Sequence, residues 1–217
     1  MTRIVYLHGF ASSPMSSKAR FFHDRLERAG ADIEIPDLAD GDFEHLTITG
    51  QLAVIAKAVA RGPVSLMGSS LGGYLAALFA ARHPGAVDRL VLLAPAFGFA
   101  RRWPERLGPD AAARWRDTGS MEVFHYGDKC TRRLAYTMLA DGARYEDYPD
   151  FRQPALIFHG ANDEVVPVRY SEKFAATHPN AKLAVLHSGH ELLDVLEVMA
   201  PIVEAFLLDS YTGNRPT

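Results

Sequence analysis

A serine lies between two glycines in the segment GSSLG, which runs from Gly68 to Gly72. The segment follows an apolar run over Val64–Met67 and precedes a helix-like run over Leu71–Arg82. A serine on such a tight strand-to-helix turn exposes its hydroxyl from a strained backbone, and the two glycines keep side chains out of the crowded turn. The pattern therefore predicts that Ser70 is a nucleophile. The alternative interpretation is a glycine-rich turn whose serines cap the helix.

A serine nucleophile needs a base to take its proton and an acid to orient that base. Asp163 follows the apolar run Ala155–Phe158, and His190 follows the apolar run Lys182–Leu186. Both come just after a predicted strand, and open α/β sheets bind their ligands beyond the carboxyl ends of the strands. The chain order Ser70, Asp163, His190 is the order found in α/β folds that carry a nucleophile elbow. These three residues are predicted to form a catalytic triad.

Neighbouring residues offer alternative partners for the serine. His187 lies three residues before His190 and is a second candidate base, and Glu164 adjoins Asp163 and is a second candidate acid. Asp194 lies one helical turn beyond His190 and is expected to face solvent. The segment that begins at His190 resembles a zinc-protease helix but lacks its second histidine, so we predict no metal site there.

Acyl transfer to a serine also needs two backbone N–H groups that point at the developing oxyanion. One is expected from Leu71, directly after the nucleophile. The other should come from the loop after the first predicted strand, where Phe10 is the candidate and Ala11 the alternative. His8, at the start of that loop, is interpreted as a hydrogen-bonded structural histidine.

The elements that must position these residues are visible as an alternation of short and longer apolar patterns. Six short runs, several of them continuous in Val, Ile and Leu, are typical of parallel strands covered on both faces. They are Arg3–Leu7, Asp32–Ile35, Val64–Met67, Arg89–Leu93, Ala155–Phe158 and Lys182–Leu186. Five runs have helical periodicity, namely Ser17–Ala29, Leu46–Ala60, Leu71–Arg82, Ser171–Thr177 and Glu191–Leu208. This alternation predicts an α/β fold with a parallel sheet and helices on both faces.

Residues 97–151 interrupt the alternation with a segment far longer than the ~2–6 residues usual for such a connection. We expect a small helical cap insertion over the sheet, with a helix-like piece at Thr131–Ala140. Its aromatic side chains could line an acyl pocket or form the insertion's own core; they are Phe97, Phe99, Trp103, Trp115, Phe124 and Tyr126. The candidates for substrate binding among them are Phe97, Trp103 and Tyr126.

The chain has 217 residues, of which 48 % are hydrophobic and 23 % charged, so it is expected to fold as an ordinary globular protein. That length predicts one domain over residues 1–217 with one insertion. Cys130 is the single cysteine, which excludes an internal disulfide and a two-cysteine metal site. The net charge is -3 and the basic residues form no run, which argues against binding to nucleic acid or to a membrane surface.

The ends of the chain and its hydropathy support two further expectations. The N-terminus leads straight into a predicted strand without the apolar core of a secretory signal, and no run approaches the ~20 apolar residues of a membrane span. We therefore expect a cytoplasmic protein. The last residues, Thr212–Thr217, are expected to be a frayed tail.

Three motifs resemble the small bacterial α/β-hydrolase esterases of the YqiA-like group. They are YLHGF at residues 6–10, SSP at residues 12–14 and GSSLGGY at residues 68–74. Asp163 and the segment SGH at residues 188–190 match the wider α/β-hydrolase superfamily. The resemblance covers the sheet-forming parts of the chain but not residues 97–151. Because the chain begins at the strand before His8, the two usual leading strands are absent, and we predict a six-stranded, mostly parallel sheet of order 2-1-3-4-5-6.

The resemblance implies a Ser-His-Asp carboxylic-ester hydrolase that uses no cofactor, with Ser70, Asp163 and His190 at the matching positions. With the motifs, it predicts hydrolysis of a small or medium carboxylic ester, or of a thioester, as a small-molecule substrate. The same triad acting on a carbon–carbon bond or a peptide is the alternative. A non-catalytic binding module with a hydrolase-like fold is a third interpretation. No metal, nucleic-acid or membrane partner is expected.

Overall fold

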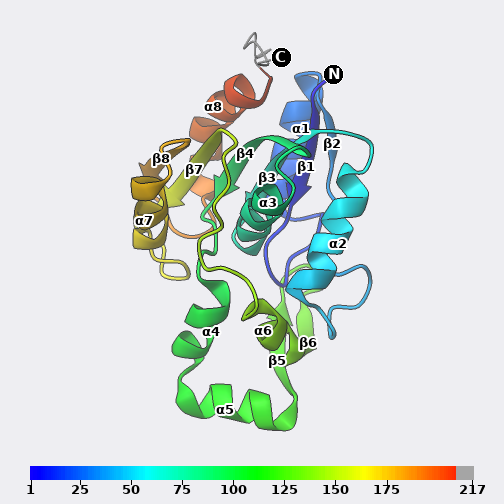
Figure 1. Cartoon of the computed structure of the whole chain (residues 1–217), viewed down its shortest axis with the longest axis vertical. Helices are drawn as coiled ribbons and strands as arrows, with labels where there is room; N and C mark the ends of the chain where they lie inside the picture. The colour runs from blue at the N-terminus through cyan, green and yellow to red at the C-terminus, as the bar shows by residue number, and fades with distance from the viewer. Residues whose placement is uncertain (209–217) are drawn as a thin grey trace.

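The computed structural model describes residues 1–208, and the predicted tail at Thr212–Thr217 lies outside this part. Six strands form one sheet in which every neighbouring pair is parallel. They are β1 (Arg3–Leu7), β2 (Asp32–Glu34), β3 (Val64–Ser69), β4 (Val87–Leu93), β7 (Ala155–Gly160) and β8 (Ala181–Leu186). Their order is β2-β1-β3-β4-β7-β8 (Figure 1). The predicted order 2-1-3-4-5-6 numbers only the strands of this sheet, and the observed order agrees with it. The last two strands are labelled β7 and β8 because the insertion contributes strands β5 and β6.

Helices cover both faces of the sheet, which confirms the predicted fold class. They are α1 (Ser17–Arg28), α2 (Ile48–Val59), α3 (Leu71–Arg82), α7 (Arg169–Thr177) and α8 (Leu196–Leu208). Buried side chains of α2, α3 and α7 pack with Val5 and Leu7 on one face, and those of α1 and α8 pack with Ile4 and Tyr6 on the other. Because successive strand residues point to opposite faces, each central strand buries both of its sides.

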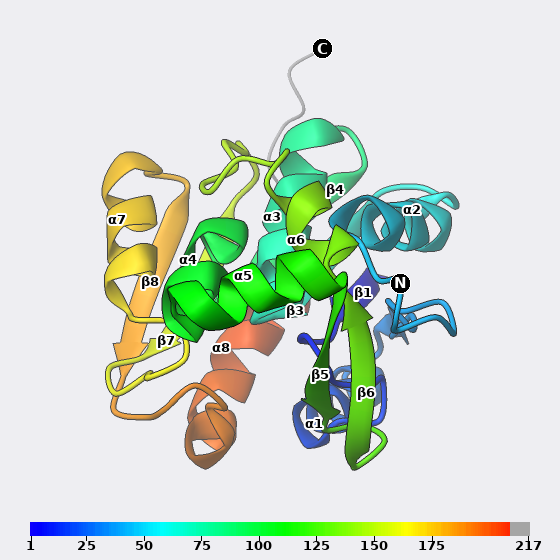
Figure 2. The ribbon, with the colours of Figure 1, turned by 90° about the horizontal axis from the view of Figure 1, so that it is seen from below.

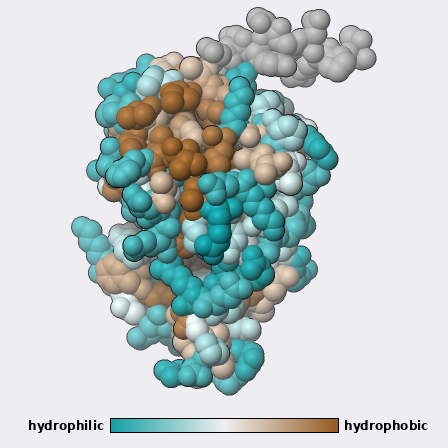
Figure 3. Space-filling model, turned by 90° about the vertical axis from the view of Figure 1, so that its left-hand side faces the viewer, coloured by the Kyte–Doolittle hydropathy of each residue, from teal (hydrophilic) through white to brown (hydrophobic). Residues whose placement is uncertain are grey.

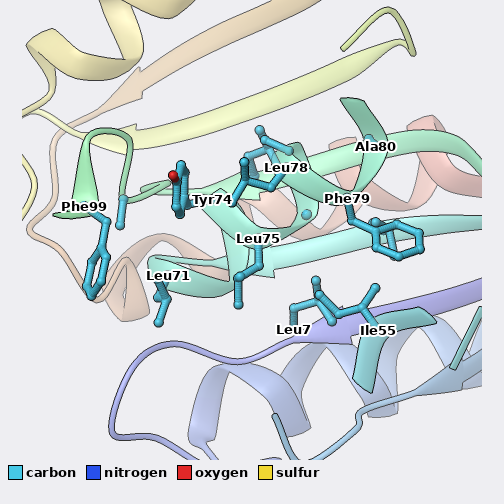
Figure 4. Packing of buried hydrophobic residues seen from close by; sticks show 14 of the residues in the cluster. Leu7, Ile55, Leu71, Tyr74, Leu75, Leu78, Phe79, Ala80 and Phe99 are labelled. Atoms are coloured by element: carbon cyan, nitrogen blue, oxygen red, sulfur yellow. The ribbon is translucent and has the colours of Figure 1, made fainter. Parts of the chain in front are cut away.

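Helix α3 is surrounded by apolar neighbours. Every residue from Leu71 to Ala80 is buried, so the helix is apolar all round and not amphipathic. Leu75 points toward Leu7 of β1 and Ile55 of α2 (Figure 4). This packing holds the start of α3 against the sheet, and with it the preceding residue, Ser70.

The insertion forms a layer beyond the carboxyl ends of the strands, at the bottom of Figure 1 and facing the viewer in Figure 2. It contains helices α4 (Phe99–Leu107), α5 (Pro109–Thr118) and α6 (Thr137–Gly142). Between them lies an antiparallel hairpin of β5 (Ser120–His125) and β6 (Cys130–Ala135). The expected helices are therefore present, but the insertion also contains a β-hairpin that the sequence analysis did not predict.

The misread segment is Thr131–Ala140, which starts as strand β6 and becomes helical only at α6. The first four residues of β6, from Cys130 to Arg133, are all exposed, so no alternation of buried and exposed residues marks them as a strand. β6 forms because β5 supplies its hydrogen-bond partners. β5 does show the alternation, with Met121, Val123 and His125 turned inward from more exposed neighbours.

The C-terminal helix starts later than predicted. The expected helix over Glu191–Leu208 begins as a 3-10 turn, η1 (Leu193–Val195), and continues as α8. Leu192 has a φ of 55°, a left-handed conformation that a helix cannot contain. His190 therefore lies in a loop. No helix within residues 1–208 is both long and apolar enough to cross a membrane.

Apolar side chains gather on the face formed by β8 and α8 (Figure 3). Exposed large apolar residues of these elements and of η1 are Val185, Leu193, Val198 and Ile202. β8 is the last strand of the sheet, so this apolar face lies at one edge of the sheet. It lies away from the insertion, which occupies the opposite end of the same view.

Candidate active site

Ser70 lies at the turn between β3 and α3, in a backbone conformation that L-residues rarely adopt. Its φ is 54° and its ψ is −116°. Two backbone hydrogen bonds hold the turn against the end of β4 and the residues that follow it. The N–H of Ser70 donates to Leu93 O at 2.8 Å, and the N–H of Ala96 donates to Ser70 O at 2.9 Å. The strained turn is held from both sides and presents the hydroxyl beyond the end of the sheet.

Gly68 and Gly72 are required by close backbone contacts at this turn. A Cβ at Gly72 would overlap the carbonyl oxygen of Leu7 and lie 2.6 Å from that of His8. A Cβ at Gly68 would overlap the carbonyl oxygen of Gly72 and lie 2.7 Å from the nitrogen of Gly73. Real Cβ atoms do not approach so closely, so the turn can form only with glycine at both positions.

The loops after β7 and β8 bring an acid and an imidazole to this serine. His190 Nε2 lies 3.0 Å from Ser70 Oγ, and His190 Nδ1 lies 2.7 Å from Asp163 Oδ2. Asp163 is buried, whereas Ser70 and His190 are half-buried. Nδ1 donates to the carboxylate, which leaves Nε2 of the neutral ring free to accept the serine hydrogen. The structure thus brings the three sequence-predicted residues into one hydrogen-bonded line.

The Asp163 carboxylate is a buried negative charge. Burial by itself raises its pKa, but hydrogen bonds from His159, His190 and the N–H of Val166 act in the opposite direction and lower the pKa well below its ordinary value. Its second oxygen, Oδ1, accepts from the N–H groups of Val165 and Val166 at 2.8 and 2.7 Å. The carboxylate therefore remains ionised and fixed beside His190.

The alternative base and acid lie elsewhere. His187 is exposed at the end of β8, and Glu164 is exposed in the loop after β7. Within residues 1–208, His187 forms no hydrogen bond with Ser70, and Glu164 forms none with His190, whose partners are Ser70 and Asp163. Asp194 is exposed and accepts a hydrogen bond from the Ser188 hydroxyl, which steadies the loop after β8. In the same described residues, no group of three His, Cys, Asp or Glu side chains is arranged to hold a metal ion.

The two predicted oxyanion donors lie on segments that border the serine. Leu71 begins α3, and the first N–H groups of a helix have no partner within the helix. Phe10 lies in the loop after β1, where a Cβ at Gly9 would be 3.5 Å from Ser70 Cβ. In the described part of the chain, neither the N–H of Leu71 nor that of Phe10 donates to another protein group. Ala11, the alternative donor, has a φ of 51°.

The three predicted substrate-binding aromatics have different surroundings. Phe97 is fully buried and stacks on Phe174 with ring centroids 4.5 Å apart, so it belongs to the core and offers no surface to a ligand. Trp103 is half-buried and meets the ring of Phe10 edge-on at 4.9 Å. Tyr126 is 72 % exposed on the hairpin, and its contact with substrate stays a prediction.

Sequence reasoning missed His159, which contacts the acid. It lies near the end of β7, and its Nε2 is 3.1 Å from Asp163 Oδ2. The signal was its position four residues before Asp163, but a histidine in a buried strand is as readily explained by core packing. His8 does behave as a structural histidine: its Nε2 accepts from the N–H of Leu38, and its Nδ1 contacts Gly9 O.

The parallel sheet, the helices on both faces and the serine at a strand-to-helix turn define a member of the α/β-hydrolase superfamily. Among solved structures, α/β hydrolase domain-containing protein 10 from mouse is similar with a TM-score of 0.78. The match covers 94 % of this chain and 88 % of that one at 20 % identity, a level at which it shows the fold alone.

Residues 3–207 match the family described as Uncharacterised protein family (UPF0227), and the chain belongs to this family. The chain is similar to lysophospholipase L2 of Escherichia coli (strain K12), with 24 % identity over 204 residues that cover 70 % of this chain and 60 % of the relative. It is also similar to pimeloyl-(acyl-carrier protein) methyl ester esterase of Aromatoleum aromaticum, with 29 % identity over 157 residues, 54 % of this chain and 62 % of the relative. The match spans 41 % to 62 % of the length of four curated relatives and 80 % of a fifth.

Replacing Gly72 with alanine should destabilise the whole fold, because the new Cβ would force α3 away from β1. We expect the free energy of unfolding in urea to fall by about 2–4 kcal/mol. The control is Gly85→Ala, whose Cβ would meet no atom of residues 1–208 within 4 Å and should change stability by less than about 0.5 kcal/mol. Equal stability of the two variants would contradict the required glycine.

Asp163→Asn should lower stability in a pH-dependent way. Because folding lowers the pKa of Asp163, its contribution is fully present above the ordinary Asp value of about 4 and is lost as pH falls below it toward the folded value. We expect D163N to be about 2 kcal/mol less stable than wild type at pH 7, with the difference shrinking below about pH 4. Urea midpoints from pH 7 to pH 3 measure this, and a constant difference would contradict it.

Proposed function

We propose that this chain hydrolyses a small or medium carboxylic ester, or a thioester, through a catalytic triad of Ser70, His190 and Asp163. The observation that carries the proposal is the hydrogen-bonded line from Ser70 Oγ through His190 to Asp163, with distances of 3.0 and 2.7 Å, at a strained turn. A serine that only capped a helix would need neither the imidazole nor the buried carboxylate. The names of two similar relatives, a lysophospholipase and a methyl ester esterase, support a hydrolase.

The reaction follows from the positions of these atoms. His190 Nε2 takes the proton of Ser70 as Oγ attacks the carbonyl carbon, and Asp163 holds the imidazole in the tautomer that can do so. The same nitrogen then gives the proton to the leaving alcohol, which leaves an acyl-enzyme. Water attacks that ester with His190 again as base, the acid is released and Ser70 regains its proton. Side chains and backbone groups suffice, so we propose no metal or cofactor.

The N–H groups of Leu71 and Phe10 are proposed to stabilise the oxyanion. Both are free of protein acceptors in the described residues, and both flank the serine. The close approach of α3 to the end of β1 at Gly72 keeps their two segments together. Donors fixed in this way need no reorganisation when the negative charge develops on the carbonyl oxygen.

The hairpin of the insertion supports the loop that carries Phe10. The N–H of Tyr126 donates to Ala11 O at 2.7 Å, so the tip of the hairpin is bonded to that loop. The next residue, Gly127, packs so tightly that a Cβ would lie 2.8 Å from Ser13 Cβ and 3.1 Å from His125 Cε1. We infer that the insertion helps to place one oxyanion donor.

An aromatic wall stands beside the proposed oxyanion site. The ring of Phe10 lies 4.9 Å from that of Trp103 and 5.7 Å from that of Phe43, and all three are half-buried. Trp103 in turn packs on Trp115, which is fully buried. Because this wall is apolar and backed by rigid packing, we propose that it contacts a short acyl group.

Ser70→Ala should keep the fold and lose the activity. Alanine can occupy the same backbone conformation as serine, so we expect the thermal midpoint to stay within a few degrees. Turnover of p-nitrophenyl acetate should fall at least about a thousand-fold. A fluorophosphonate probe should add mass to wild type and not to S70A. A variant that keeps a tenth of the wild-type rate would refute the assignment of the nucleophile.

A series of p-nitrophenyl esters from acetate to palmitate tests the acyl preference, with S70A as the blank. We expect the highest kcat/KM at the short end, because the packed aromatic wall leaves little room for a long chain. A maximum at the long end would contradict the short-acyl proposal and leave the triad standing. Probe labelling without turnover of any ester would favour a carbon–carbon or peptide bond as the substrate.

Gly127→Ala should slow turnover more than it lowers stability. The added Cβ must push the hairpin tip away from Ser13, which weakens the bond from Tyr126 to Ala11 and loosens the Phe10 donor. We expect kcat to fall roughly tenfold, less than the ~100-fold or more that follows complete loss of a donor. Gly85→Ala is again the control, and a kcat equal to that of the control would contradict the role of the hairpin.

A further inference from the structure

His159 is a buried histidine that contacts the same carboxylate as His190. Its side chain belongs to β7 and has no exposed surface. Nε2 lies 3.1 Å from Asp163 Oδ2 and 2.7 Å from Val166 O, and Nδ1 lies 2.7 Å from Oγ of Ser171, a buried residue of α7. Both ring nitrogens are therefore paired, and one of the partners is the acid of the proposed triad.

The partners assign the hydrogens on the His159 ring. Nε2 faces a carbonyl oxygen and an ionised carboxylate, which can only accept, so Nε2 carries a hydrogen. In the neutral ring Nδ1 then accepts from the Ser171 hydroxyl. The Nε2–H bonds to Val166 O at 2.7 Å and also lies 3.1 Å from Asp163 Oδ2, a contact that lowers the pKa of the carboxyl. His190 Nδ1 donates to the same carboxylate oxygen at 2.7 Å.

We propose that His159 is a positioning residue that orients the Asp163 carboxylate and withdraws part of the negative charge that His190 meets. This inference rests on the proposed function, since it concerns the same triad. Oδ1 is already held by the N–H groups of Val165 and Val166, so the contact with His159 Nε2 restrains the remaining oxygen. An oxygen that accepts from two imidazoles also stabilises a positive charge on either one less than it would alone.

Other charged groups face Asp163 from farther away. Lys18, buried on α1, and Arg102, half-buried on α4, both interact with its negative charge, and Glu191 beside His190 interacts with Lys18. Within residues 1–208, the side chains that contact Oδ2 are the two histidines. A change in proton uptake by His190 after substitution of His159 therefore reports on that shared oxygen.

A purely structural role is the competing explanation. Nε2 donates to Val166 O at the shorter of its two distances, and Nδ1 joins β7 to α7 through Ser171. A tie of this kind would affect stability alone. A positioning residue must also change the pH at which His190 gains its proton, so the measurement has to follow the imidazole and not only the unfolding transition.

Two amide substitutions of His159 test its two ring nitrogens one at a time. The amide of H159N occupies the place of Nδ1 and can bond Ser171, but it does not reach Asp163. The amide of H159Q occupies the place of Nε2 and can still donate to Asp163. Ser171→Ala is the matched control, because it removes the far tie and leaves the bond to the carboxylate in place.

The readout is the rate at which a fluorophosphonate probe reacts with Ser70, measured against pH. Oγ forms a bond to phosphorus, fluoride leaves and His190 takes the serine proton, so the rate requires the neutral imidazole. The acid limb of the profile is the pH range in which the rate rises as His190 loses its proton. For H159N we expect this limb to move to higher pH by roughly half a unit or more, because the Asp163 carboxylate then stabilises the protonated His190 more strongly. Its plateau rate should fall roughly tenfold, because the carboxylate is less well oriented. H159Q and S171A should keep the wild-type limb.

Three outcomes distinguish the inference from the function on which it rests. An H159N profile that superimposes on wild type, or an H159Q limb that moves as far as that of H159N, overturns the role of His159 and leaves the triad intact. Failure of wild-type Ser70 to react with the probe contradicts the proposed function itself. Should H159N not fold, H159Q decides alone: the inference requires that it keep both the wild-type limb and the wild-type proton resonance of His190 Nδ1–H, and a change in either overturns it.

Discussion

The backbone of α3 passes the end of β1 so closely that no side chain fits between them, and the site is arranged around this approach. Gly72 permits it, since a Cβ there would overlap the carbonyl oxygen of Leu7. The approach sets the N–H of Leu71, which has no acceptor within residues 1–208, beside the loop after β1, and Ser70 takes a φ of 54° at the turn. Helix α3 cannot move to relieve that conformation, because it is buried as far as Ala80 in a close-packed core. The core therefore maintains the strained serine.

The buried negative charge of Asp163 also constrains the structure. An ionised carboxylate in the interior is costly unless hydrogen bonds compensate it. Asp163 receives them from its own loop, through the N–H groups of Val165 and Val166, and from the imidazole of His190. The imidazole of His159 adds a polar contact of 3.1 Å to the same carboxylate. The contact with His190 is the one that the proposed chemistry uses. The other three keep the carboxylate ionised and oriented when that contact changes during the reaction.

The insertion reaches the same site through the loop after β1. The hairpin tip is bonded to that loop by Tyr126, which donates to Ala11 O, and Trp103 of α4 packs on Phe10. The proposed acyl wall and the proposed oxyanion donor thus share one residue, Phe10. A change in the insertion can act on both the fit of the substrate and the placement of the donor without touching the triad.

The residue pattern alone was enough to predict the sheet, its strand order and the segments that meet at the candidate site. Strands buried on both faces appear as continuous apolar runs. The glycines around the serine are recognisable because the tight turn leaves no room for a side chain at their positions. Asp163 and His190 could be placed because each follows a strand, and parallel strands end at one edge. The three-dimensional arrangement was needed to show that His190 and not His187 contacts Ser70, that β6 pairs with β5, that Phe97 is buried and that His159 lies beside the carboxylate. Each of these depends on a partner distant in the chain, and residue periodicity reports only which face of its own element a side chain occupies.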